Sequence, residues 1–381
     1  MRLNFFTFSQ FQKSQTGSQS KNRDVGNNKV YIKGRNFSTV FILGAGATRG
    51  AIPHVILNRK RLKPPLNSDF FKIALTYAPA KGTNSADNKR LKQVNLFFRD
   101  YLPTKKDNLD METAFSLLFM AKDFPNIYAA QRGRRHESGG RPEIEDFLRL
   151  AFGIFTILDR SSSDKTAYDR LVTVLGTNDT LITLNYDTLL DSALARQGWN
   201  PKNGYCLGGG KRKVNWIPNR ISSNINLTHI HLLKLHGSIN WFVRGSFSDL
   251  SAIFSKKPVR VENPRKNEIR GYIRQIVPPI YGKFFGHDHW RNLWLEAYRS
   301  LCESEILVVI GCSLVESDFH LLALLSRVSK WRKNRRELFR RIIFVDRARV
   351  RRKWARALKG SYSKVSSYSS FEVFLRNELK V

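Results

Sequence analysis

The chain has 381 residues, of which 41% are hydrophobic and 12% aromatic, and this content excludes a disordered protein. Its three cysteines, Cys206, Cys302 and Cys312, include no C-x-x-C pair. We therefore expect neither a disulfide framework nor a cysteine-based zinc site, and we predict no metal cofactor. This use of cysteine fits a reducing cytoplasm. No apolar stretch is long enough for a membrane span, and the N-terminus lacks the apolar run of a signal peptide, so we expect a soluble protein without membrane contact.

The charge is strongly positive, with 65 Lys and Arg against 31 Asp and Glu, a formal net charge of +34. Such an excess repels itself unless an acidic partner lies nearby. Nucleic acid is the first candidate for that partner, and an acidic protein is the second. Composition says nothing about sequence specificity.

Residues 1–37 are polar and show little periodicity, which predicts a flexible arm before one domain at 38–381. Within that domain, short apolar runs predict buried strands. These runs are Thr39–Leu43, Thr180–Leu184, His231–Leu235, Ile306–Ile310 and Arg341–Val345.

Helical patterns separate the strands. They lie after the glycines at 44–50, at 94–101, 111–121, 142–158 and 165–175, after Asp187, and at 290–302 and 318–330. We interpret residues 65–175 as a mostly helical insertion. The alternation of strands and helices predicts an α/β, Rossmann-like parallel sheet with helices on both faces. In such sheets ligands bind beyond the carboxyl ends of the strands.

The first strand ends in Gly44-Ala45-Gly46-Ala47, followed by a helical pattern. Glycines at this place allow a tight turn and a close approach of the backbone to a pyrophosphate, and the helix start offers free N–H groups. The match to G-x-G-x-x-G is partial, because Arg49 occupies the place of the third glycine. A strand–helix turn without a ligand is the alternative.

Polar residues follow the next two strands. The amide of Asn185 can hold a ribose hydroxyl or a water, and the carboxylate of Asp187 can fix that amide or a sugar. Both residues fit helix caps as well. His236 can serve as a general base or orient a ribose, or it can be a structural histidine.

The last two predicted strands end in similar fashion. Gly311 would allow close ligand approach, and Ser313 could bond to a phosphate or ribose. Asp318, nearby, suits a helix cap equally well. Asp346 could accept a ribose hydroxyl, or pair with a neighbouring arginine.

These motifs in this order resemble the sirtuin-like NAD-binding family, especially its bacterial branch in antiviral defence. The matching stretches are Gly44-Ala45-Gly46-Ala47-Thr48, Thr183-Leu184-Asn185-Tyr186-Asp187, Leu235-His236-Gly237-Ser238, and Gly311-Cys312-Ser313-Leu314 with Asp318. The resemblance implies a set of roles. Gly44, Ala45 and Gly46, with Thr48 beside them, would hold the NAD pyrophosphate. Asn185 and His236 would be catalytic, and Asp187 would support Asn185. Ser313 and Asp346 would lie near the adenosine half, and Gly311 would allow the cofactor to approach closely.

Two departures from the deacylating sirtuins matter. Those enzymes carry an Ile-Pro-Asp stretch where this chain has Ile52-Pro53-His54, and they use a four-cysteine zinc module that this chain cannot build. Thr48 replaces the usual serine but keeps a hydroxyl. The resemblance therefore implies an NAD hydrolase that consumes NAD as substrate, and acts in antiphage defence by NAD depletion. An NAD-dependent deacylase and a non-catalytic nucleic-acid-binding subunit are the alternatives.

The resemblance also implies a homo-oligomer and a HerA-type ATPase partner. From the residues themselves, segment 327–360 is the strongest partner signal, with fifteen Lys or Arg between Arg327 and Lys359 against Glu337 and Asp346. Aromatic side chains are interleaved with them, at Trp331, Phe339 and Trp354. This basic C-terminal segment predicts DNA contact, with the aromatics available to stack on bases, or docking to an acidic protein.

Overall fold

The computed structural model describes residues 37–57, 60–70, 73, 110–123, 165–206, 230–244, 272–277, 288–315 and 318–381, all within one compact unit that starts at Ile32. The predicted arm therefore lies outside the described residues except for Phe37. The helical patterns predicted at 94–101 and 142–158, and most of the predicted insertion, lie outside them too.

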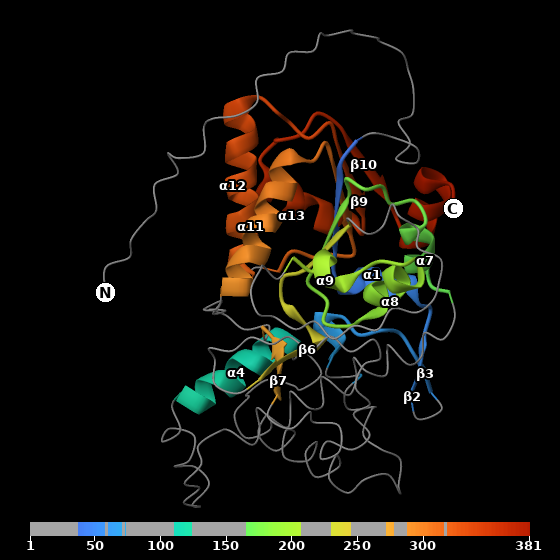
Figure 1. Ribbon diagram of the computed structural model, residues 1–381, viewed down its shortest axis with the longest axis vertical. Coiled ribbons are helices and arrows are strands. Elements are labelled where there is room, and N and C mark those ends of the chain that lie inside the picture. The colour runs from blue at the N-terminus through green and yellow to red at the C-terminus, as the bar shows by residue number, and fades with distance from the viewer. Residues whose placement is uncertain are drawn as a thin grey trace, which may run out of the picture. The chain divides into compact units, whose positions relative to one another are not determined.

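A six-stranded parallel sheet with the order β10-β9-β8-β1-β4-β5 forms the centre of the fold (Figure 1). Its strands are β1 (Thr39–Leu43), β4 (Thr180–Thr183), β5 (His231–Lys234), β8 (Ile306–Ile310), β9 (Arg341–Val345) and β10 (Val365–Tyr368). The order is that of a doubly wound sheet, so the predicted Rossmann-like α/β fold is confirmed. Five of the six strands lie where the apolar runs predict them.

The central strands are apolar on both sides because helices cover both faces of the sheet. All five residues of β1 and all five of β8 are buried. Contacts between elements place α1, α7, α8 and α14 in one group and α11, α12 and α13 in another, and Figure 1 shows these groups on opposite sides of the strands. Their bounds are α1 (Ala45–Ala51), α7 (Ala167–Val172), α8 (Leu189–Arg196), α11 (Asp288–Glu303), α12 (Phe319–Arg335), α13 (Ala348–Leu358) and α14 (Phe371–Phe374).

The direction in which the sheet grows reverses between β1 and β8. From β1 the chain adds β4 and then β5 on one side, and from β8 it adds β9 and then β10 on the other. Such a reversal leaves a crevice at the carboxyl ends of the two central strands, where open α/β sheets bind their ligands. The loops that begin at Gly44 and Gly311 meet at this point.

The sequence patterns missed three features. The edge strand β10 has the sequence VSSY, whose residues alternate between exposed and half-buried, so it contains no apolar run. Two antiparallel hairpins also form, β2 (Val55–Leu57) with β3 (Lys60–Leu62), and β6 (Gly237–Arg244) with β7 (Tyr272–Ile276). Because β6 starts at Gly237, only a tight turn separates it from β5.

The described parts of the predicted insertion include the helices α4 (Met111–Asp123) and α7 and a short 3-10 turn, η1 (Asn67–Asp69). The remaining short elements are α9 (Pro201–Gly204) and the C-terminal π-helical turn η5 (Leu375–Leu379). Within the described ranges, no helix is both long and apolar enough to cross a membrane.

The expectation that the aromatic side chains of the basic C-terminal segment can stack on bases is wrong for two of the three residues, whereas Trp331 is half-buried. Phe339 and Trp354 are each 0% exposed, and the indole of Trp354 donates to the carbonyl of Cys312 at 2.8 Å. Arg332 is also buried, lies over the Phe339 ring, and donates to the carbonyls of Leu301 and Glu337. These two aromatic rings belong to the core and are not available to stack on bases.

Candidate functional site

Two glycine-containing turns interlock at the point where the sheet reverses. The amide of Gly44 donates to Ile310 O at 3.0 Å, and the amide of Gly46 donates to Gly311 O at 2.9 Å. A Cβ on Gly44 would lie 2.6 Å from Gly311 O, and one on Gly311 would lie 2.1 Å from the amide nitrogen of Ala47. Gly311 also has a φ of +56°, a conformation that favours glycine. These glycines therefore allow two segments of the chain to touch.

Asn185 joins the end of β4 to the same turn. Its side-chain Nδ2 donates to Gly44 O at 2.9 Å and to Thr48 Oγ1 at 3.0 Å. The hydroxyl of Thr183 donates to Leu43 O and accepts from the amide of Asn185, which fixes the backbone there. Among the described residues, the Oδ1 atom of Asn185 forms no hydrogen bond, so this oxygen is the part of the amide that can accept one from a ligand.

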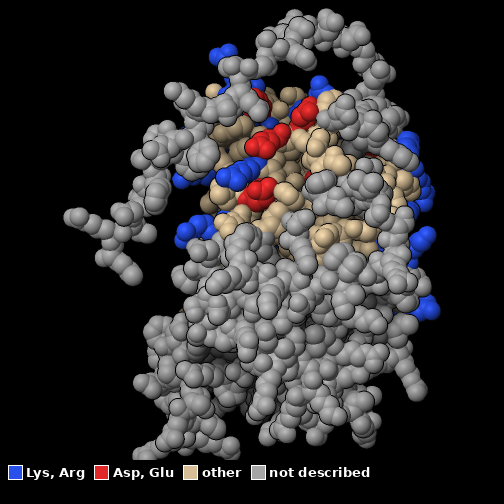
Figure 2. All heavy atoms as spheres, viewed as in Figure 1, with Lys and Arg blue, Asp and Glu red and all other residues tan. Residues whose placement is uncertain are grey.

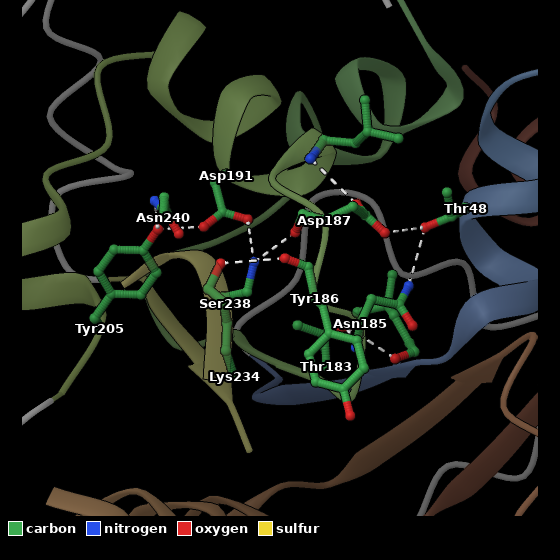
Figure 3. Close-up of polar contacts among 12 residues, drawn as sticks. Thr48, Thr183, Asn185, Tyr186, Asp187, Asp191, Tyr205, Lys234, Ser238 and Asn240 are labelled. Carbon is green, nitrogen blue, oxygen red and sulfur yellow. Dashed lines mark hydrogen bonds and ion pairs between the residues drawn. The ribbon is translucent and has the colours of Figure 1, made fainter. Parts of the chain in front are cut away.

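Thr48 is the centre of a buried polar network (Figure 3). Its Oγ1 lies 3.0 Å from each of three atoms: Tyr168 OH, Asp187 Oδ2 and Asn185 Nδ2. The sequence predicts that Asp187 supports Asn185. In the structure the two are linked through the hydroxyl of Thr48, which donates to the carboxylate and accepts from the amide.

Asp187 is held from both sides. Its Oδ1 accepts from the amide of Leu189 at 3.2 Å, as an Asp at the start of a helix commonly does. Burial raises the pKa of this carboxyl, while the nearby Lys234 ammonium opposes that rise. Both the ligand-supporting and the helix-start interpretations of Asp187 therefore fit the structure.

Lys234 lies beneath the site and is 0% exposed. Its Nζ donates to Asp187 O at 2.6 Å and to Asp191 Oδ2 at 2.9 Å, and Figure 3 shows it between these partners. The hydroxyl of Tyr205 donates to the other oxygen of Asp191, and Asn240 donates to that hydroxyl. A buried ammonium and carboxylate thus satisfy one another and fix the backbone at Asp187.

His236 occupies the place after β5 that Asn185 occupies after β4, since Thr183 pairs with Lys234 in register. It is 5% exposed, and its ring stacks on that of Tyr186 with centroids 6.4 Å apart. Its Nε2 lies 3.3 Å from Oδ1 of Asp318, which is also 5% exposed. The two atoms are within ion-pair distance but are not aligned for a hydrogen bond.

Asp318 precedes α12 but its side chain does not cap that helix. The helix cap that the sequence allows is therefore not formed by this side chain, and the carboxylate of Asp318 lies beside His236 instead. Its partner is a histidine on the other side of the reversal point, and this pairing brings β5 and the start of α12 together.

The remaining predicted residues lie at the same edge of the sheet. Ser313 follows β8 and is exposed, and Asp346 follows β9 and is half-buried. Asp346 Oδ1 accepts from the amide of Arg347 at 2.6 Å, and burial raises the pKa of its carboxyl. Among the described residues, neither side chain contacts Asn185 or His236. Their assignment to the adenosine half stays a prediction.

Sequence reasoning missed three members of the network, Tyr168, Lys234 and Asp191. Lys234 had a usable signal, because a charged residue inside the apolar stretch HLLKL must be buried with a partner. Tyr168 had none, since its helix is separated from the glycine turn by 120 residues. Within the described part of the chain, no group of three or more His, Cys, Asp or Glu could hold a metal ion.

Three solved structures show how far the likeness to known proteins extends. A mutant Sir2 homologue complexed with 2'-O-acetyl ADP ribose shares 12% identity, covers 90% of each chain and has a TM-score of 0.40. A structure described as a basis for the mechanism and regulation of Sir2 enzymes shares 13%, covers 90% of this chain and 92% of its own, and has a TM-score of 0.37. A Sir2 homologue complexed with NAD shares 13%, covers 85% and 89%, and has a TM-score of 0.30.

A comparison with curated proteins gave no match. The family model described as "SIR2-like domain" matches residues 179–362. That range begins just before β4 and includes Asn185, Asp187, His236, Gly311 and Asp346. Over residues 179–362, a little less than half of its length, the chain is therefore similar to a SIR2-like domain.

Proposed function

We propose that this protein is an NAD hydrolase, which cleaves the nicotinamide–ribose bond and releases ADP-ribose and nicotinamide. The observation that carries the proposal is the fixed orientation of Asn185. Both N–H groups of its amide are bound by Gly44 and Thr48, so Oδ1 is the atom left to a ligand at the edge of the sheet. The match of residues 179–362 to the SIR2-like domain and the doubly wound sheet support NAD as the substrate.

The chemistry requires a nucleophile on the face of the ribose opposite to nicotinamide. The C1′–N bond breaks, its electron pair stays on nicotinamide, and an oxygen of water bonds to C1′. Positive charge develops at C1′ before the new bond is complete, so a pre-positioned water lowers the barrier by saving the entropy of bringing it there. Asn185 Oδ1 accepts a hydrogen bond from this water or from a ribose hydroxyl.

His236 takes the proton that the attacking water loses, as a general base. Asp318, 3.3 Å from Nε2, then stabilises the positive imidazolium that forms. The ring is held in place by its stack on Tyr186, whose own hydroxyl donates to Val277 O at 2.7 Å. Asp318 and Tyr186 are positioning residues, whereas Asn185 and His236 contact the reacting groups.

The pyrophosphate would lie over the Gly44 turn. There the amides of Gly44 and Gly46 are already bound to β8 and its loop, and among the described residues the Ala45 amide is not hydrogen-bonded. Ser313 and Asp346, at the ends of β8 and β9, would face the adenosine half. A role in antiphage defence by NAD depletion, with a homo-oligomer and a HerA-type ATPase partner, belongs to the same proposal.

The experiment measures nicotinamide release from NAD by the purified chain, alone and with candidate partners. Asn185→Ala and His236→Ala should each lower kcat at least about 100-fold, the range typical of a lost acid–base or positioning group. Far-ultraviolet circular dichroism and a melting curve check that the variants fold. Lys165→Gln, which changes an exposed residue away from the site, is the control.

Full release by both variants would overturn the assignment of the site. Formation of O-acetyl-ADP-ribose from an acyl-lysine peptide, without release of ADP-ribose, would show that the protein is a deacylase instead.

A further inference from the structure

The surface of α13 combines a strongly positive stripe with a buried apolar face. Val350, Trp354 and Leu358 point into the core at the helical spacing of four residues. The other side of the helix carries four exposed cations, and a fifth is the residue that ends the helix. These are Arg349, Arg352, Lys353, Arg356 and Lys359, and we call them the basic stripe. Their spacing of three and four residues places them in one row along the helix.

Among the described residues, no salt bridge neutralises the stripe, although the charge of Arg349 acts on the carboxylate of Asp346. None of its five cations forms an ion pair with a described residue, and residues 347–371 contain no Asp or Glu. Basic side chains elsewhere in the same segment have partners: Arg341 is bound to Glu378, and Arg340 lies near Glu305. The charges of the basic stripe therefore stand apart from the structural arginines around them.

Its composition works against the stability of the isolated helix. Like charges three or four residues apart repel, and the stripe contains five such pairs, beginning with Arg349 and Arg352. The first turn has no acidic residue, while Arg347 occupies the N-cap, where a positive charge opposes the helix dipole. A bound polyanion would relieve both effects.

We propose that the basic stripe of α13 binds the phosphate backbone of duplex nucleic acid without sequence specificity. Arg349 and Lys359 are ten residues apart, which is about 15 Å along a helix and so about four phosphates of one strand. Three of the five cations are arginines, whose planar guanidinium groups bind phosphate oxygens in pairs. With Phe339 and Trp354 in the core, these two rings cannot stack on unpaired bases, which favours a duplex over a single strand.

Charges of both signs are found elsewhere on the described surface. In the upper part of the face in Figure 2, Asp and Glu side chains lie beside Lys and Arg side chains, so the charge there is mixed. A mixed surface attracts a polyanion only weakly, whereas a row of unpaired cations releases several counterions when it binds a polyanion, so that its binding depends steeply on salt. The inference is independent of NAD cleavage, because Arg352, Lys353 and Arg356 contact none of the proposed site residues in the described structure, and only Arg349 acts on one of them, Asp346.

The test compares two triple variants of the full chain that remove the same net charge. Arg352→Gln, Lys353→Gln and Arg356→Gln alter the stripe. Arg61→Gln, Lys63→Gln and Lys165→Gln alter exposed cations on β3, directly after β3 and before α7. Fluorescence anisotropy follows binding to a random-sequence DNA duplex from about 50 to about 200 mM salt. The stripe variant should bind about 100-fold more weakly at physiological salt, with a log–log salt slope smaller by about 2.7.

The control variant should bind like the wild type, and both should retain the wild-type rate of nicotinamide release. Equal losses in the two variants would mean that net charge alone matters, and would overturn the proposal. So would the absence of duplex binding by the wild type, or displacement of the duplex by polyglutamate at equal charge concentration, which would identify an acidic protein as the better ligand.

Discussion

The hydroxyl of Thr48 makes three hydrogen bonds within a buried network, and Thr48→Val removes it with almost no change in volume. The bond to the Asp187 carboxylate should contribute about 2 kcal/mol, and the bonds with Tyr168 and Asn185 about 0.5–1 kcal/mol each. We therefore expect the free energy of unfolding to fall by about 3 kcal/mol. Asn185 keeps its bond to Gly44 O but loses the second, so its amide can turn, and kcat should fall about 10-fold.

Urea unfolding, followed by tryptophan fluorescence, measures the first effect, and nicotinamide release under saturating NAD measures the second. Thr48→Ser is the matched control, since it keeps the hydroxyl and should lie within about 1 kcal/mol of the wild type. If the valine variant were as stable as the serine variant, the hydroxyl would not be the centre of this network. If it were equally active, Thr48 would not position Asn185.

Three further predictions concern stability. Gly311→Ala places a Cβ within 2.1 Å of the Ala47 amide nitrogen, whereas Gly360→Ala, at φ +72° with open space around it, adds only a backbone strain of about 1–2 kcal/mol. Urea unfolding should therefore show a much larger loss of unfolding free energy for Gly311→Ala than for Gly360→Ala. Equal losses would contradict the contact between the two glycine turns. Burial raises the pKa of the Asp179 carboxyl to about 6, above its value in the unfolded chain. About 3 kcal/mol of stability that is present below pH 4 should therefore be lost as the pH rises through 6. In Asp179→Asn, the unfolding free energy should no longer show this dependence on pH. Lys234→Met leaves the buried Asp191 carboxylate without its cation, and should lower the free energy of unfolding by about 3–5 kcal/mol in thermal or urea unfolding. A second change, Asp191→Leu, should restore most of this loss. If it restored none, Lys234 would act through packing alone.

The sheet could be predicted from the sequence because its strands are short apolar runs buried on both faces. Thr39–Leu43 and Ile306–Ile310 show this most clearly. The edge strand at 365–368 could not, since only one side of an edge strand pairs and its residues alternate between exposed and half-buried. Amphipathic spacing gave the helix at 318–330 but not its extension to Arg335, where the residues are mostly charged.

The residues of the site could be identified because each follows a strand at the edge where ligands bind. Their connections could not. Nothing local to Thr48 indicates that it contacts Tyr168 and Asn185, which are more than a hundred residues away in the chain. In the basic segment, the sequence shows which residues are charged but not which of them are exposed. Composition cannot distinguish Arg332, which is buried against backbone carbonyls, from the exposed arginines of α13.

The contact between the glycine turns limits how this sequence can diverge. A side chain at Gly44, Gly46 or Gly311 would collide with backbone atoms of the opposite turn, and backbone cannot be exchanged for something smaller. No substitution at one of these positions can be compensated at another, as a large and a small core residue can trade volume. The three glycines can therefore be replaced only in a chain whose β1 and β8 lie further apart, and such a chain would lack the crevice between these strands.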